Sequence, residues 1–234
     1  STLSDRAFAA FATAPADQVV VLPRALDGRP FPGEPLGCAM NIFARSGIEA
    51  GQTVAIVGIG FLGALLVQLT KAAGARVIAI SRREYSRRIA GEAGADETVP
   101  FGEAWAVEER VKALTDGGLC DRVIECTGKQ EAVDVIGKLA RVRGRVVIAG
   151  FHQGGPRAVD MQLWNWRGLD VINAHERDPE RYLAGIRGAV AAVVAGRMDP
   201  FPLLTHEFPL EELGTALDTT AERPDGFVKA VVRP

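Results

Sequence analysis

The stretch VAIVGIGFLGALLVQLTKAAGARVIAISRR, residues 54–83, predicts the fold of this chain. A β-branched run leads into three glycines, an apolar helix-like segment follows, and a second β-branched run ends at two arginines. A strand, a glycine-rich turn, a helix and a second parallel strand form the first half of a dinucleotide-binding unit. We therefore expect the rest of the sequence to complete a sheet of this type.

Short β-branched runs alternate with helix-like stretches along most of the remaining chain, which is typical of a parallel sheet with crossover helices. The strand candidates are residues 53–57, 76–80, 97–99, 122–126, 145–149 and 169–174. The helix candidates are residues 61–73, 86–93, 103–114, 130–140 and 179–195. This order predicts an α/β fold with a Rossmann-like, doubly wound parallel sheet in residues 51–177.

Residues 1–50 and 178–234 lie outside this predicted sheet. The head contains a strand-like run, VVVLP, then a loop rich in proline and glycine, and then a helix. The tail contains a helix behind a proline in FPLLTHEFPLEELGTALDTT and a strand-like segment, GFVKAVV. Neither piece predicts a domain alone, so we expect them to pack on each other or on something absent from this chain.

The composition excludes several classes of partner. Apolar residues make up 47% of the chain, charged residues 24%, and the net charge of -2 gives no reason to expect nucleic acid. No segment approaches the roughly 18 uninterrupted apolar residues of a membrane span. The three cysteines form no C-x-x-C pair, which favours a reducing compartment, and we expect a cytoplasmic protein.

Gly58, Gly60 and Gly63 form a G-x-G-x-x-G motif between the first predicted strand and helix. In a dinucleotide site the first glycine permits the turn, the second admits the pyrophosphate, and the third allows close packing of helix and strand. Phe61 and Leu62 begin the helix, whose N-terminal N–H groups favour phosphate. A purely structural turn, or a Rossmann domain for another nucleotide, remains the alternative.

The end of the second strand indicates which dinucleotide binds. An NAD site usually has Asp or Glu there, whereas this chain has Ser81, Arg82 and Arg83. Arginine forms charge-assisted hydrogen bonds to a 2′-phosphate, so the sequence favours NADP(H) over NAD. Two alternatives stay open: the arginines decorate the start of the next helix, or nearby Glu84 binds the ribose of NAD.

Two later segments reach the same edge of the predicted sheet, where ligands bind in open α/β folds. The segment IECTG makes Thr127 and Gly128 candidates for the adenosine side of the cofactor. The segment VVIAGFHQGG makes Gly150, Phe151 and His152 candidates for the nicotinamide side. An ordinary loop histidine is the alternative interpretation of His152.

Several motifs together resemble the medium-chain dehydrogenase/reductase superfamily of zinc-type alcohol dehydrogenases, most closely its polyol and threonine dehydrogenase branch. They are EPLGCAMNIFARSGIEAGQTVAIVGIGFLGALLVQLTKAAGARVIAISR, EAGADETV, DRVIECTG, GRVVIAG and PLLTHEFPLEELGTAL, in that order. The match runs almost end to end. Even RAFAAFATAPADQVVVLP resembles the closing part of the family's catalytic domain, so residues 1–50 and 178–234 are interpreted as a remnant of that domain.

The resemblance also implies what the chain lacks. In zinc-dependent members, an upstream catalytic domain supplies the metal with a cysteine and a histidine-glutamate pair, so we expect no metal site here. Whether that domain is absent by natural loss or by truncation stays open. Glu34 matches a glutamate near the zinc of polyol dehydrogenases, although it also suits the start of a helix beside Pro35. Family members commonly pair through the last strand, here LDVINAHE, which implies a homodimer.

The sequence and the resemblance together predict hydride transfer between NADP(H) and an alcohol or carbonyl, without zinc ligands in this chain. Two other functions stay open. One is a non-catalytic NADP(H)-binding module or sensor. The other is a zinc-independent reductase of double bonds, or a lyase, on the same fold. The substrate that the protein uses is not encoded in any motif that we recognise.

Overall fold

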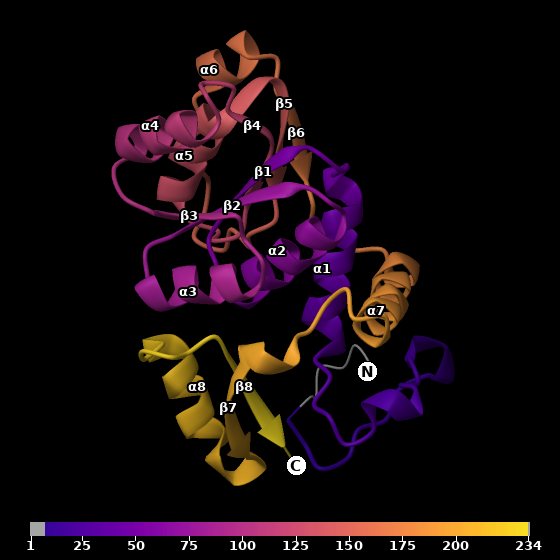
Figure 1. Ribbon diagram of the computed structural model, residues 1–234. Helices are drawn as coiled ribbons and strands as arrows, with labels where there is room; N and C mark the ends of the chain where they lie inside the picture. The colour runs from indigo at the N-terminus through magenta and orange to yellow at the C-terminus, as the bar shows by residue number, and fades with distance from the viewer. Residues whose placement is uncertain (1–7, 234) are drawn as a thin grey trace. The chain divides into compact units, whose positions relative to one another are not determined.

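The computed structural model describes residues 8–233, which divide into two compact units (Figure 1). One unit is Asn41–His175, and the other contains the chain before Asn41 and after His175. The first seven residues of the predicted head lie outside the described residues. Within the described residues, no helix combines the length and the apolar character that crossing a membrane requires.

A six-stranded parallel sheet forms the centre of the Asn41–His175 unit. Its strands lie in the order β3-β2-β1-β4-β5-β6, so the chain starts in the middle, moves to one edge, and returns to build the other half. The strands are β1 Thr53–Val57, β2 Arg76–Ser81, β3 Glu97–Pro100, β4 Cys120–Glu125, β5 Ala140–Ile148 and β6 Asp170–Asn173. This order confirms the predicted doubly wound Rossmann-like sheet.

Helices cover both faces of this sheet, as Figure 1 shows. Helices α2 (Phe61–Ala72) and α3 (Glu84–Glu92) lie on one face, and α4 (Ala104–Leu114) and α5 (Gln130–Leu139) lie on the other. The side chains of β1 and β2 are almost entirely buried. Because both faces are covered, the strands need continuous apolar runs rather than alternation, and this explains why β-branched runs predicted them.

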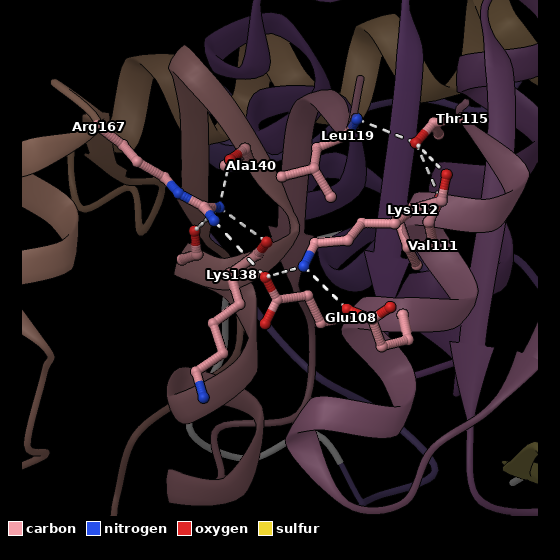
Figure 2. Close-up of polar contacts among 10 residues, drawn as sticks. Glu108, Val111, Lys112, Thr115, Leu119, Lys138, Ala140 and Arg167 are labelled. Atoms are coloured by element: carbon pink, nitrogen blue, oxygen red, sulfur yellow. Dashed lines mark hydrogen bonds and ion pairs between the residues drawn. The ribbon is translucent and has the colours of Figure 1, made fainter. Parts of the chain in front are cut away.

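A short helix, α6 (Met161–Trp166), precedes the edge strand and was not predicted. Arg167 follows it and donates from Nη1 to the carbonyls of Gly137, Lys138 and Ala140 at 2.8 to 3.0 Å (Figure 2). Its Nη2 also lies 3.6 Å from Glu108 of α4. The guanidinium therefore satisfies carbonyls at the C-terminal end of α5, where a positive charge is favoured, and ties that end to α4.

The second unit combines the head and the tail of the chain. It contains the start of α1 (Gly33–Ser46), then α7 (Pro179–Val194), β7 (Leu204–Pro209), α8 (Leu213–Glu222) and β8 (Lys229–Arg233). Four short 3-10 turns are η1 Ala16–Gln18, η2 Arg24–Leu26, η3 Phe201–Leu203 and η4 Leu210–Glu212. Strands β7 and β8 pair in parallel as a two-stranded sheet, and β7 was not predicted.

The head contacts the tail through a small apolar cluster and a cation–π contact. Val20 packs in a small buried cluster with Leu183 and Ile186 of α7, and the Arg29 guanidinium lies 3.2 Å from the ring centre of Phe201. The prediction that VVVLP forms a strand is wrong: only Val19 makes an isolated bridge there. An extended run needs a neighbouring strand along its length, and in the described part of the chain only Val20 of this run packs on α7, whereas Val21 is exposed.

Candidate functional site

The turn between β1 and α2 contains three glycines with two different structural roles. Gly58 has φ +98°, a conformation that favours glycine, and its N–H donates to the Ile80 carbonyl at 2.9 Å. A Cβ on Gly63 would lie closer than 3.0 Å to the Gly58 carbonyl oxygen. A Cβ on Gly60 would meet no heavy atom within 4 Å. Gly58 and Gly63 therefore build the turn, and Gly60 borders open space.

The N-terminus of α2 begins at this open space. Gly60 is the N-cap residue and offers no side-chain hydrogen bond to the helix. Phe61 is buried, and Leu62 is only partly exposed. The first N–H groups of a helix lack intrahelical partners and carry the positive end of its dipole, so an anionic group is favoured here. The arrangement fits a pyrophosphate that approaches the backbone at Gly60.

The carboxyl end of β2 borders a pocket of about 380 Å³. Arg82 lines this pocket together with Phe101 and Glu131. Its guanidinium carbon lies 5.2 Å from the Phe101 ring centre, and its Nη2 lies 3.8 Å from a Glu131 carboxylate oxygen. Of the three candidates that the sequence offered at the end of this strand, Arg82 is therefore the one whose charge borders a space large enough for a ligand.

The neighbouring residues Ser81 and Arg83, unlike Arg82, are not part of the pocket lining. Ser81 is buried at the end of β2, and Arg83 is the N-cap residue of α3. Arg87 was not singled out from the sequence, yet its Nη1 donates to the carbonyls of Ser81 at 3.1 Å and Arg82 at 2.7 Å. Arg87 thus holds the backbone from which the Arg82 side chain projects. Glu84 is exposed as the first residue of α3.

A buried carboxylate, Glu125, organises the loop after β4 and was missed in the sequence. Its Oε1 accepts from the Thr127 N–H and hydroxyl, both at 2.5 Å, and from the Gly128 N–H at 2.8 Å. The Thr127 hydroxyl also accepts from the Lys129 N–H at 3.0 Å. The hydroxyl predicted for the adenosine side is therefore already engaged within the loop. The only sequence signal was a charge at the end of an apolar strand.

The loop after β5 lies against the loop after β4. A Cβ on Gly150 would lie closer than 3.0 Å to the Gly128 nitrogen and to a Glu125 oxygen. His152 places Nε2 at 3.1 Å from Glu125 Oε2. Phe151 is 69% exposed, and its ring stacks on His175 with centres 5.9 Å apart. The structure thus brings together the two segments that the sequence assigned to opposite ends of the cofactor.

Glu34 lies in the other unit, near the start of α1. Its Oε1 accepts from the Tyr182 hydroxyl of α7 at 3.0 Å and from the Cys38 thiol at 3.3 Å. The thiol and the Tyr182 hydroxyl are also 3.3 Å apart. Burial raises the pKa of Cys38 to about 11, partly offset by the Tyr182 contact, and burial and Cys38 both raise the pKa of Tyr182. Both groups therefore remain protonated donors to Glu34 at neutral pH.

Tyr182 was missed because it lies 148 positions from Glu34 in sequence. No grouping of three or more His, Cys, Asp or Glu side chains that could hold a metal ion occurs in residues 8–233. The glycine turn and the loops at the sheet edge belong to the Asn41–His175 unit and form the candidate cofactor site, whereas Glu34 and its two donors form a separate cluster in the other unit.

Comparisons with known proteins agree with this architecture. The chain is 32% identical over 214 residues to L-threonine 3-dehydrogenase of Bacillus subtilis, covering 88% of this chain and 58% of that protein. It is 28% identical over 199 residues to 2-dehydro-3-deoxy-L-galactonate 5-dehydrogenase of Pseudoalteromonas atlantica, covering 85% and 56% respectively. The chain thus spans somewhat more than half the length of these curated relatives.

A solved structure from Sinorhizobium meliloti, described as a zinc-binding dehydrogenase bound to NADP, superposes with a TM-score of 0.78 at 33% identity. The match covers 94% of this chain and 64% of that one. The sequence profile described as "Zinc-binding dehydrogenase" matches residues 62–188, more than half of this chain. The chain therefore belongs to the zinc-binding dehydrogenase family, in the medium-chain dehydrogenase/reductase superfamily that its motifs resemble.

Proposed function

We propose that this chain binds NADP(H) and serves an oxidoreductase that transfers hydride between nicotinamide and an alcohol or carbonyl substrate. Its family and the dehydrogenase names of its relatives support this reaction class. The bound cofactor would supply the hydride chemistry, and the protein would bind and orient it. We assign residues 51–177 to the dinucleotide-binding domain, and residues 1–50 and 178–234 to the catalytic-domain remnant.

The observation that carries the NADP(H) proposal is Arg82 beside an open pocket, at the end of a strand that has no carboxylate. We assign Arg82 to the 2′-phosphate, with Ser81 and Arg83 as its neighbours. The related Sinorhizobium meliloti structure, bound to NADP, supports the same preference. NAD remains the alternative cofactor, because Glu131 places a carboxylate in the lining of this pocket and Glu84 begins the helix that follows Arg83.

The rest of the proposed cofactor site follows the sheet edge. Gly58, Gly60 and Gly63, with Phe61 and Leu62, form the turn and helix start that would bind the pyrophosphate. The loop after β4, with Thr127 and Gly128, would face the adenosine half. The loop after β5, with Gly150, Phe151 and His152, would face the nicotinamide. Each assignment rests on position at the carboxyl edge of the strands, where ligands bind in this fold.

Glu34 is our candidate for a catalytic residue. Two protonated groups, the Tyr182 hydroxyl and the Cys38 thiol, donate to the same carboxylate oxygen and fix its orientation. The other oxygen, Oε2, accepts no bond from these two donors and is our candidate to hold a water or substrate hydroxyl. We expect Glu34→Gln to lower turnover while leaving cofactor affinity within about twofold, because we assign this carboxylate to the substrate and not to the nucleotide.

Two further proposals concern the state of the protein. Strand β6, Asp170–Asn173, forms an edge of the sheet and is mostly exposed, so we propose that two chains form a homodimer by pairing these strands. Size-exclusion chromatography with light scattering measures this oligomeric state directly.

The three cysteines are free thiols, which suits a reducing compartment, and we therefore propose a cytoplasmic location.

Calorimetric titration with NADPH and NADH tests the cofactor proposal, with metal content measured on the same sample. We expect Arg82→Gln to weaken NADPH binding about tenfold to a hundredfold, since charge-assisted hydrogen bonds contribute about 1.5 to 3 kcal/mol. NADH binding should change less than about twofold. Arg110→Gln, an equal charge change at an exposed position of α4, is the control. Equal losses for both nucleotides would contradict the 2′-phosphate assignment.

Turnover assays on alcohols, aldehydes and enones then separate the remaining functions. Oxidation of an alcohol or reduction of a carbonyl supports the proposed reaction. Tight NADPH binding without turnover favours a binding module or sensor. Reduction of an enone alone favours the zinc-independent double-bond reductase. If neither nucleotide binds, the glycine turn is purely structural in this chain.

A further inference from the structure

Glu125 is the one charged residue among the buried residues of the described chain, with a relative exposure of 0%. It ends β4 in the middle of the sheet, at the edge where the cofactor loops begin. Burying a carboxylate is costly unless hydrogen bonds compensate it. Neither the glycine motif nor Arg82 explains why a carboxylate is buried at this position.

The hydrogen-bond partners of Glu125 lie on two different loops. On the β4 side, Oε1 accepts three hydrogen bonds from Thr127 and Gly128. On the β5 side, Oε2 faces Nε2 of His152 at 3.1 Å. The main-chain carbonyl of Glu125 also accepts from the N–H groups of Ala149 and Gly150, at 2.9 and 2.8 Å. One residue thus joins the loop after β4 to the loop after β5.

We propose that Glu125 is a positioning residue that locks these two loops together and fixes the tautomer of His152. The consequence for cofactor binding rests on the proposed function, whereas the tautomer does not. A loop that is already ordered costs less free energy to immobilise when a ligand binds. Glu125 thereby raises cofactor affinity without touching the cofactor.

The tautomer follows from donor and acceptor chemistry. A carboxylate oxygen only accepts, so the 3.1 Å contact requires a proton on Nε2 of His152. In the neutral ring Nδ1 then carries the lone pair. Nδ1 is buried and has no hydrogen-bond partner among the described residues, so no protein group there competes for a different tautomer. Glu125 thus sets the ring orientation and the position of its proton.

Glu125→Gln should reverse the tautomer of His152 while leaving the side-chain volume nearly unchanged. The three donors from Thr127 and Gly128 require an acceptor, so the glutamine carbonyl takes their side and its NH₂ group faces His152. An NH₂ group donates, so Nε2 must become the acceptor and the ring proton must move to Nδ1. A residue that only filled space would leave the tautomer unchanged.

Nitrogen-15 NMR of the histidine rings tests this inference. The chain has only three histidines, so His152→Gln assigns the relevant signals by their loss. We expect Nε2–H in the parent protein and Nδ1–H in Glu125→Gln, with His206 unchanged. Asp218→Asn, an equal charge change on exposed α8, should alter neither ring. Nδ1–H in the parent protein would overturn the inference, and this outcome does not depend on whether Glu125→Gln folds.

Calorimetry on the same samples tests the consequence for the cofactor. We expect Glu125→Gln to weaken NADPH binding by up to about tenfold, the limit reached if the whole of the lost charge-assisted contact to His152 had ordered the loop before the cofactor bound. Binding of 2′,5′-ADP, which lacks the nicotinamide half, should change less than about threefold. Unchanged NADPH affinity together with a swapped tautomer would overturn the affinity role alone. If the parent chain binds neither NADPH nor NADH, the proposed function fails, and the NMR result still decides whether Glu125 fixes His152.

Discussion

Alanine at Gly60 and alanine at Gly63 should have opposite effects on cofactor binding and on stability, although the two positions belong to one turn. Gly60→Ala places a methyl group in open space, because no heavy atom lies within 4 Å of the point that its Cβ would occupy. Its backbone is extended, with φ -102° and ψ -156°, so alanine fits without strain. Gly63→Ala instead places a methyl group against the Gly58 carbonyl oxygen.

The expected magnitudes follow from these surroundings. The Cβ of Gly63→Ala would lie closer than 3.0 Å to the carbonyl oxygen and hence well inside ordinary van der Waals contact, so the turn or the helix must move. Overpacking of this kind typically costs about 1 to 3 kcal/mol, or about 2 to 12 °C in Tm for a chain of this size. Gly60→Ala should change Tm by less than about 2 °C, since the entropy that alanine removes from the unfolded chain offsets a poorer N-cap.

For cofactor affinity we expect the opposite order, with the larger loss in Gly60→Ala. If the pyrophosphate approaches the backbone at Gly60, a methyl group there displaces it and weakens its hydrogen bonds to charged oxygens. We expect Gly60→Ala to lower NADPH affinity at least about tenfold, the effect of losing about 1.5 kcal/mol. Differential scanning calorimetry measures Tm, and isothermal titration measures affinity. A Gly60→Ala protein that binds NADPH like the parent protein would refute the pyrophosphate assignment, and equal Tm losses would refute the division of roles.

Further predictions concern charged groups and thiols. Glu131→Gln removes an exposed ion pair to Arg82 and should raise NADPH affinity by up to about fivefold in a fluorescence titration, with NADH unchanged. Burial raises the pKa of Asp96, but hydrogen bonds from Lys71 and a backbone N–H outweigh it and hold the pKa below its usual value. Its stabilising effect is thus lost as the pH falls, and the Tm difference between the parent protein and Asp96→Asn should shrink below about pH 4 in a pH series. Arg167→Met leaves carbonyls at the end of α5 without donors and should lower Tm by about 2 to 12 °C in a thermal melt. Burial raises the pKa of all three cysteine thiols, so Ellman's reagent should react slowly with them at pH 8 until the chain is unfolded.

The sheet was predictable because its signals are local. Each strand is an apolar run buried on both faces, and each helix follows within a few residues, so neighbouring sequence decides both. Helix α6 escaped because six residues are too few to show helical periodicity. Its one local signal was Asp160, whose carboxylate accepts from the Leu163 N–H at 2.9 Å as an N-cap. Strand β7 escaped prediction because its partner residues in β8 lie 24 or 25 positions farther along the chain.

The candidate site was predictable only in part, for a related reason. The glycines carry a spacing that sequence shows directly, and the arginines follow a strand whose end can be counted. Glu125 and Tyr182 act through partners that only the folded chain brings to them. A charged residue at the end of the apolar run VIEC was a usable signal for Glu125, because such a position is buried in a parallel sheet. No sequence signal linked Tyr182 to Glu34.

The site residues therefore form two groups: those that hold the loops of the site in place, and those that border space open to a ligand. Glu125 and Arg87 use their charges on backbone groups of this chain, so their loss should disturb loop geometry before it disturbs any direct contact. Gly60 and Arg82 border open space, so their loss should affect binding with little effect on folding. If the cofactor site is where we place it, affinity and stability will separate along this division. If substitutions at Gly60 and Arg82 instead change stability and affinity together, the open space beside them has a structural role, and the cofactor binds elsewhere.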